Sequence, residues 1–134
     1  MEAPSLVENA DRLILAMGYW PSFHDANVMS VERSDRTVRL SIHVFAMTDR
    51  VDPAGYYVLE RHHLVTFAFR GITSDSLPDA YESDCLDRLW FEQSGALVLA
   101  HLESHMDLGG EVLCSRVAIQ DVAPCSPKGV RLGA

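Results

Sequence analysis

The spacing of hydrophobic residues changes once along the chain, near residue 20. Before that point, apolar residues recur every three or four positions, which is typical of a helix with one buried face. They are Leu6, Ala10, Leu13, Ile14 and Met17. Ser5 and Glu8 form a capping-box pattern, in which both side chains can accept hydrogen bonds from unpaired backbone N–H groups, and Gly18 suits the left-handed end of a helix. The pattern predicts a helix over residues 5–17.

After residue 27, hydrophobic and polar residues alternate or form short apolar runs, as in β-strands. In the clearest case, over 37–46, Val38, Leu40, Ile42 and Val44 alternate with Arg39, Ser41 and His43. This is typical of a half-buried antiparallel strand, so we expect His43 on the solvent side. The other expected strands cover about 27–33, 56–59, 62–72, 86–93, 96–102 and 111–122. Ser34-Asp35-Arg36 and Ser94-Gly95 are turn sequences, and 47–55 is expected to be a loop.

One helix followed by about six strands at hairpin spacing predicts an α+β fold. We expect the N-terminal helix to pack on a mostly antiparallel, twisted sheet that is half-barrel or sandwich-like. A length of 134 residues fits a single domain, 1–134. Its β region would span about 27–122, and Pro124, Pro127 and Gly129 favour an irregular, loosely held C-terminal tail over 123–134.

The formal net charge is −8, from 11 basic and 19 acidic residues. Nucleic-acid binding requires clustered Lys and Arg, so this charge disfavours nucleic acid as a partner. An acidic surface favours a basic protein partner through electrostatic steering, although acidity also serves solubility alone. The chain has three cysteines without a C-x-x-C pair, no signal-peptide pattern and no apolar run long enough to cross a bilayer. These features predict a cytoplasmic protein with no membrane partner.

Negative charge is concentrated between residues 75 and 87, a segment without Lys or Arg. Such a segment is usually a solvated loop. If it binds a partner, its carboxylates would pair with Lys or Arg, and an aromatic side chain would supply the apolar centre of the contact. The candidate partner-binding residues are therefore Asp75, Asp79, Tyr81, Glu82, Asp84, Asp87 and Trp90.

The stretch between the helix and the first long strand contains Ser22, His24 and Asp25, the residue types of a hydrolytic triad. Adjacent side chains of an extended chain point to opposite sides, so we expect Asp25 to bind backbone amides rather than the ring of His24. His24 would then lie half-buried beside Trp20 or Phe23. A small metal-dependent or ligand-binding enzyme centred on His24 and Asp25 is the alternative.

Two other groups of reactive residue types do not predict a site. His101 and His105 have an H-x-x-x-H spacing, but the first ends a strand and the second falls in a loop, so we expect isolated histidines. Cys85, Cys114 and Cys125 have no base near them in the sequence, which favours inert buried thiols. We therefore predict no catalytic, cofactor-binding or metal-binding residues and no cofactor.

The sequence Trp20-Pro21-Ser22-Phe23-His24-Asp25-Ala26 resembles the W-P-S-F-H-D-A signature of a bacterial family catalogued as immunity protein 50. The likeness extends over roughly residues 18–122, including Phe69-Arg70-Gly71-Ile72 and Leu113-Cys114. We expect the signature residues to be mainly structural.

The resemblance implies a cytoplasmic protein of a polymorphic toxin system. Such a protein binds a cognate toxin domain and inhibits it stoichiometrically, without enzymatic activity of its own. A basic toxin, such as a nuclease, would match the acidic charge of this chain. A structural or homodimeric domain that pairs through an exposed sheet edge is a third alternative.

Overall fold

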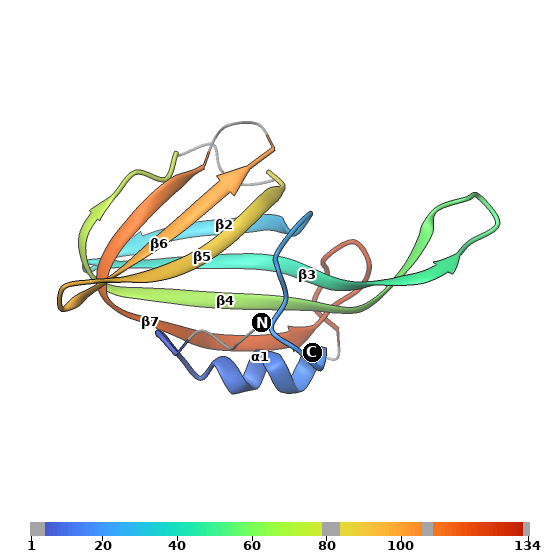
Figure 1. The fold of residues 1–134 in the computed structure, drawn as a ribbon, viewed down its shortest axis with the longest axis horizontal. Helices are drawn as coiled ribbons and strands as arrows, with labels where there is room; N and C mark the ends of the chain where they lie inside the picture. The colour runs from blue at the N-terminus through green and yellow to red at the C-terminus, as the bar shows by residue number, and fades with distance from the viewer. Residues whose placement is uncertain (1–4, 79–83, 106–108, 133–134) are drawn as a thin grey trace.

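The computed structural model describes residues 5–78, 84–105 and 109–132. It consists of one short helix and seven strands, most of them long (Figure 1). The elements are β1 (Val7–Glu8), α1 (Ala10–Met17), β2 (Asn27–Ser34), β3 (Thr37–Val51), β4 (Tyr57–Asp75), β5 (Leu86–Ser94), β6 (Leu97–Ser104) and β7 (Gly110–Pro124). The prediction of a mostly antiparallel sheet with an N-terminal helix is confirmed, although the helix is small.

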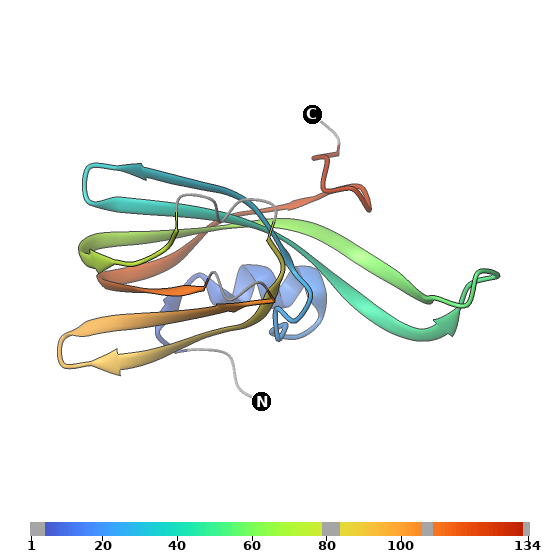
Figure 2. The ribbon, with the colours of Figure 1, turned by 90° about the horizontal axis from the view of Figure 1, so that it is seen from above.

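The strands form one open sheet in the order β2-β3-β4-β7-β6-β5, and β1 pairs in parallel with the middle of β7. All other neighbouring strands are antiparallel. The sheet curls so that the β5–β6 hairpin turns back toward β2 (Figures 1 and 2). The two outer strands meet at one corner, where Asn27 forms a bridge with Cys85 and the N–H of Val28 donates to the carbonyl of Asp84 at 2.8 Å.

The predicted helix start at Ser5 is wrong, because residues 7 and 8 belong to β1. The carboxylate of Glu8 accepts two hydrogen bonds from Arg116, at 2.7 and 2.8 Å, and is not available to cap a helix. The chain then turns at Asn9, with φ 62°, and α1 begins at Ala10. Two charge-assisted hydrogen bonds and ladder pairing with β7 outweigh a capping box. The predicted end is confirmed, since Gly18 has φ 86° and donates to the carbonyl of Ile14.

The β3–β4 hairpin is longer than predicted, and the loop expected over 47–55 is wrong for most of its length. Met47 pairs with Leu59 and Val51 with Tyr57, so the strands continue to a short turn held by the carboxylate of Asp52. Residues 47–59, which we call the arm, project beyond the rest of the sheet in both views (Figures 1 and 2). Cross-strand pairing satisfies backbone groups that a solvated loop would leave to water.

The C-terminal tail is more ordered than predicted. Cys125 is buried and forms a bridge with Arg131, and the N–H of Ser126 donates to the carbonyl of Val130 at 2.8 Å. This turn brings Gly129 against His43, which is buried and not on the solvent side as expected. The ring of His43 instead contacts His62, with 2.9 Å between Nε2 and Nδ1. Strand alternation identified the correct face of His43, but the tail covers that face.

The core is built around Phe67, whose side chain is fully buried. Its ring stacks on Phe69 and lies 5.9 Å from that of Phe91, between ring centroids. α1 packs against β7 and β4, and its buried residues Ala10, Leu13 and Met17 belong to the same hydrophobic cluster. Among the described residues, no helix has the length and apolar character needed to cross a membrane.

Candidate functional site

The joint, residues 18–26, connects α1 to β2 and is held by two aromatic residues. Trp20 is 9% exposed and Phe23 is 2% exposed. Their rings meet edge to face at 5.5 Å, and both contact Phe67, at 6.5 and 5.8 Å between ring centroids. Buried aromatic contacts of this kind stabilise a fold, so these two rings attach the joint to the core.

Between these aromatic residues and β2 the chain is a tight turn, not an extended segment. Phe23 and Asp25 both have φ 66°, and the N–H of Ala26 donates to the carbonyl of Phe23 at 3.1 Å. The hydroxyl of Ser22 accepts a hydrogen bond from the N–H of His24 at 3.2 Å. The turn places Oδ2 of Asp25 3.6 Å from Nε2 of His24. The expectation that Asp25 could not face His24 is therefore wrong, because it assumed extended backbone.

Backbone hydrogen bonds place the joint beside the beginning of β5 and the end of β6. Asp25 N–H donates to the carbonyl of Leu86, and Leu86 N–H donates to that of Ala26, both at 2.8 Å. The N–H of His105 donates to the carbonyl of Cys85 at 3.0 Å. These bonds connect segments that are far apart in the sequence.

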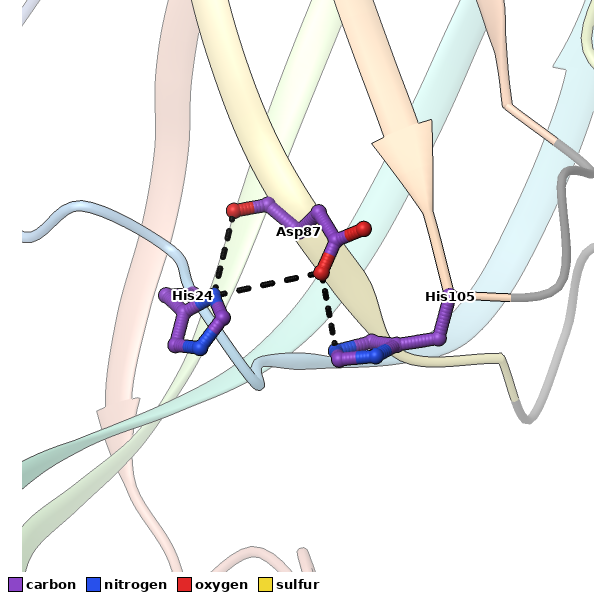
Figure 3. A group of neighbouring side chains, drawn as sticks. All are labelled: His24, Asp87 and His105. Atoms are coloured by element: carbon purple, nitrogen blue, oxygen red, sulfur yellow. Dashed lines mark hydrogen bonds and ion pairs between the residues drawn. The ribbon is translucent and has the colours of Figure 1, made fainter.

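Among the described residues, four polar side chains meet where these segments join: His24, Asp25, Asp87 and His105, which we call the His–Asp cluster. Nε2 of His105 lies 3.1 Å from Oδ1 of Asp25 and 3.2 Å from Oδ1 of Asp87. The same oxygen of Asp87 lies 4.0 Å from Nδ1 of His24 (Figure 3). His105 is therefore not the isolated histidine that the sequence suggested.

The cluster lies at the surface. The side chain of His24 is 60% exposed, so it is not half-buried beside Trp20 or Phe23 as expected, and the other three are each about 40–45% exposed. The carboxylate of Asp25 faces the two histidines, whereas the sequence had suggested backbone amides as its partners. Two carboxylates beside two imidazoles can hold protons on the rings or can hold a metal cation.

A hollow of about 270 Å³ opens next to the cluster. His24 and Asp25 contribute to its wall, and β3 contributes Val44, Phe45 and Met47, of which Met47 is the first residue of the arm. The joint, the cluster and the arm therefore adjoin one another on the surface.

The three acidic residues between 75 and 87 that the structure describes do not form one exposed surface. Asp75, at the end of β4, accepts hydrogen bonds from Arg33, and Asp84 is buried, with Oδ1 accepting from the N–H of Cys85 at 2.8 Å. Asp87 belongs to the His–Asp cluster. Asp79, Tyr81 and Glu82 lie outside the described residues. The role of this segment in partner binding stays a prediction, but Asp84 is not free to meet a partner's surface.

Trp90, the other predicted aromatic contact, is engaged within the sheet. The imidazole of His101 stacks on its ring at 4.6 Å between centroids, and the guanidinium carbon of Arg88 lies 3.9 Å from the ring centroid. His101 also bridges Glu92 and Glu111, at 2.6 and 2.9 Å. The ring is therefore partly covered, and His101 belongs to a cross-strand network.

The cysteines behave largely as expected. Burial raises the pKa of Cys114 to about 11, and burial also raises the pKa of Cys125. Cys85 is only half-buried, and burial followed by the charges of Asp25 and Asp84 raises its pKa as well. A raised pKa keeps a thiol protonated and unreactive.

Comparison of the chain with models of known protein families, with curated proteins and with solved structures finds no match.

Proposed function

We propose that this protein is a cytoplasmic immunity protein that binds a cognate bacterial toxin domain and inhibits it stoichiometrically. The class of partner follows from the resemblance of residues 20–26 to the W-P-S-F-H-D-A signature. The net charge of −8 is compatible with a basic toxin, such as a nuclease. The protein itself carries out no chemistry in this proposal.

The observation that favours a protein partner is the exposed apolar surface of the arm. It exposes large apolar or aromatic side chains, with Tyr56 at 72%, Val51 at 59%, Tyr57 at 57% and Met47 at 55%. Val51 and Tyr57 face each other across the hairpin, so they form one continuous patch. Exposed apolar patches mark interaction sites, and Tyr is enriched among residues that contribute most to binding. We therefore assign the toxin contact to the arm.

Co-expression with a candidate toxin from a neighbouring gene tests the proposal. The wild type should restore growth and co-purify with the toxin, whereas Val51→Asp with Tyr57→Ala should abolish both. Leu15→Asp is the matched control, because Leu15 is 88% exposed on α1, outside the arm. If the arm variant restores growth, the arm is not the toxin contact. If the wild type does not restore growth, the protein is not an immunity protein for this toxin.

Charge reversal tests the acidic segment separately. Asp79→Lys with Glu82→Lys should weaken capture and flatten its salt dependence if these residues meet a basic toxin. Asp84 is unsuitable for this test, because reversing a buried carboxylate would unfold the protein. If this variant captures the toxin as well as the wild type does, the acidic segment is not part of the toxin contact.

The two alternative hypotheses, a homodimer and an enzyme, predict different experimental results. A homodimer could form through the arm, where β3 extends beyond β2 and β4 extends beyond β7. Light scattering would then give twice the monomer mass, and Val51→Asp would reduce it. An enzyme centred on His24 and Asp25 would neither capture the toxin nor restore growth, and His24→Gln would abolish its catalytic activity.

A further inference from the structure

We propose that His24, Asp87 and His105 bind one divalent transition-metal ion, and that Asp25 holds the ring of His24 in place. Zn²⁺ matches these ligands best. This site goes beyond the proposed function, which requires no metal.

The distances suit a shared ion. Ligand atoms about 2.1 Å from a tetrahedral Zn²⁺ lie about 3.4 Å from one another. Oδ1 of Asp87 lies 3.2 Å from Nε2 of His105 and 4.0 Å from Nδ1 of His24. One ligand atom from each of the three residues lies within 4.8 Å of the others. Because the side chains are exposed, a small rotation closes the remaining gap.

Asp25 has the position of a residue that orients a ligand. Without an ion, Nδ1 of His24 lies 3.4 Å from the main-chain carbonyl oxygen of Asp87, a contact that metal binding would replace. When Nδ1 instead faces the ion, Nε2 carries the proton. Oδ2 of Asp25 lies 3.6 Å from that nitrogen, so a small rotation of the exposed ring is needed to form the hydrogen bond. A carboxylate on the far nitrogen of a metal-binding histidine fixes the tautomer and makes the ring a stronger ligand. The other oxygen of Asp25 lies 3.1 Å from His105 and adds negative charge beside the site.

The backbone holds the three ligands before any ion binds. The joint is bonded to Leu86, immediately before Asp87, and His105 N–H is bonded to Cys85. The positive φ of Asp25 directs the chain so that His24 and Asp25 face the same point. A site assembled from three segments by backbone hydrogen bonds loses less entropy on binding than one that must first be ordered.

The ligand types select the metal. Two imidazole nitrogens with one carboxylate suit Zn²⁺ and its transition-metal neighbours, whereas Ca²⁺ and Mg²⁺ prefer oxygen ligands alone. Three protein ligands leave a fourth position for water. The competing account is that protonated histidines neutralise the carboxylates and that no metal binds.

Isothermal titration of the full chain with zinc chloride near neutral pH tests the site. We expect one ion per chain, and Co²⁺ in place of Zn²⁺ should show the absorption of a four-coordinate complex. Asp87→Asn and His24→Gln conserve side-chain size and should each weaken binding more than tenfold, while circular dichroism stays unchanged. Asp25→Asn should weaken it by about tenfold, as expected of a residue that orients a ligand.

His63→Gln is the matched control, because His63 lies on β4 with its ring against the carbonyl of Arg61 rather than in the cluster. It should bind Zn²⁺ as the wild type does. Absence of Zn²⁺ and Co²⁺ binding at millimolar concentration would overturn the proposal. The proposal would also be overturned if Asp87→Asn bound Zn²⁺ as tightly as the wild type, or if His63→Gln lost as much Zn²⁺ affinity as the cluster variants. Toxin capture is measured independently, so failure of the metal site leaves the proposed function standing.

Discussion

Arg33 on the outer strand β2 forms a two-pronged ion pair with Asp75 at the end of β4. Nε donates to Oδ2 at 2.8 Å, and Nη2 donates to Oδ1 at 3.2 Å. Oδ1 also accepts the N–H of Leu77 at 2.9 Å. The hydrogen bonds from Arg33, and to a lesser extent the one from Leu77, hold the pKa of Asp75 below its usual value. The pair connects the strand edge to the segment that follows β4.

Asp75→Asn should lower the free energy of unfolding by about 1–2 kcal/mol, because it weakens charge-assisted hydrogen bonds at a largely buried carboxylate. Urea denaturation measures the change. Asp35→Asn is the control, since Asp35 lies at the exposed β2–β3 turn with φ 47°, a conformation that Asn accepts.

The same pair predicts a pH dependence. Asp75 has a lowered pKa in the folded protein, so the unfolded chain binds this proton more tightly. Its contribution to stability is complete above about pH 4 and is lost as the pH falls through the folded pKa. Asp75→Asn should remove that part of the acid sensitivity, and identical acid profiles for the two proteins would contradict the assignment.

Trp20→Ala should lower the free energy of unfolding by about 3–5 kcal/mol, because it removes a buried ring that packs on Phe23 and Phe67. Tyr19→Ala, the neighbouring substitution at a side chain that is 43% exposed, should cost less than about 1 kcal/mol. Thermal and urea unfolding measure both. Similar losses in the two variants would show that the joint is not held by Trp20.

Gly71→Ala should destabilise the protein more than Gly95→Ala. Both glycines have positive φ, 67° and 62°, so both substitutions carry a backbone cost of about 1 kcal/mol. An added Cβ at Gly71 would lie 2.5 Å from the hydroxyl of Ser115, whereas nothing lies within 4 Å of the same position at Gly95. The steric term adds about 1–3 kcal/mol at Gly71 alone. Equal costs in denaturation would refute the close contact.

Stability should fall as the solution becomes mildly acidic, because of His43. Burial, and then the neighbouring His62, lower its pKa in the folded protein, so protonation favours the unfolded chain. The loss begins near the ordinary histidine pKa of about 6.5 and grows until the pH reaches the lower folded value. His43→Gln should reduce this loss between those values, and His63→Gln should retain it. An unchanged profile for His43→Gln would contradict burial of a neutral ring.

Local sequence patterns correctly predicted the features that depend on a few neighbouring residues, such as turns and the buried face of a strand. The end of α1 at Gly18 and the turn after Ser94 follow from glycines, which accept positive φ. The turn before Thr37 follows from Asp35, a residue type common at positive φ. The alternation over β3 identified its buried face. Trp20 and Phe23 belong to the signature that we expect to be mainly structural, and both are buried, since large aromatic side chains gain most from leaving water.

The sequence by itself therefore determined where the chain turns and which side chains are apolar enough to be buried. Tertiary structure decided where distant segments meet: Glu8 with Arg116, the tail over His43, and His105 with Asp25 and Asp87. Each of these contacts depends on the sheet register and on backbone pairing between segments far apart in the chain. Side-chain type limits what such segments can do when they meet, but only packing of the whole sheet brings them within hydrogen-bond distance.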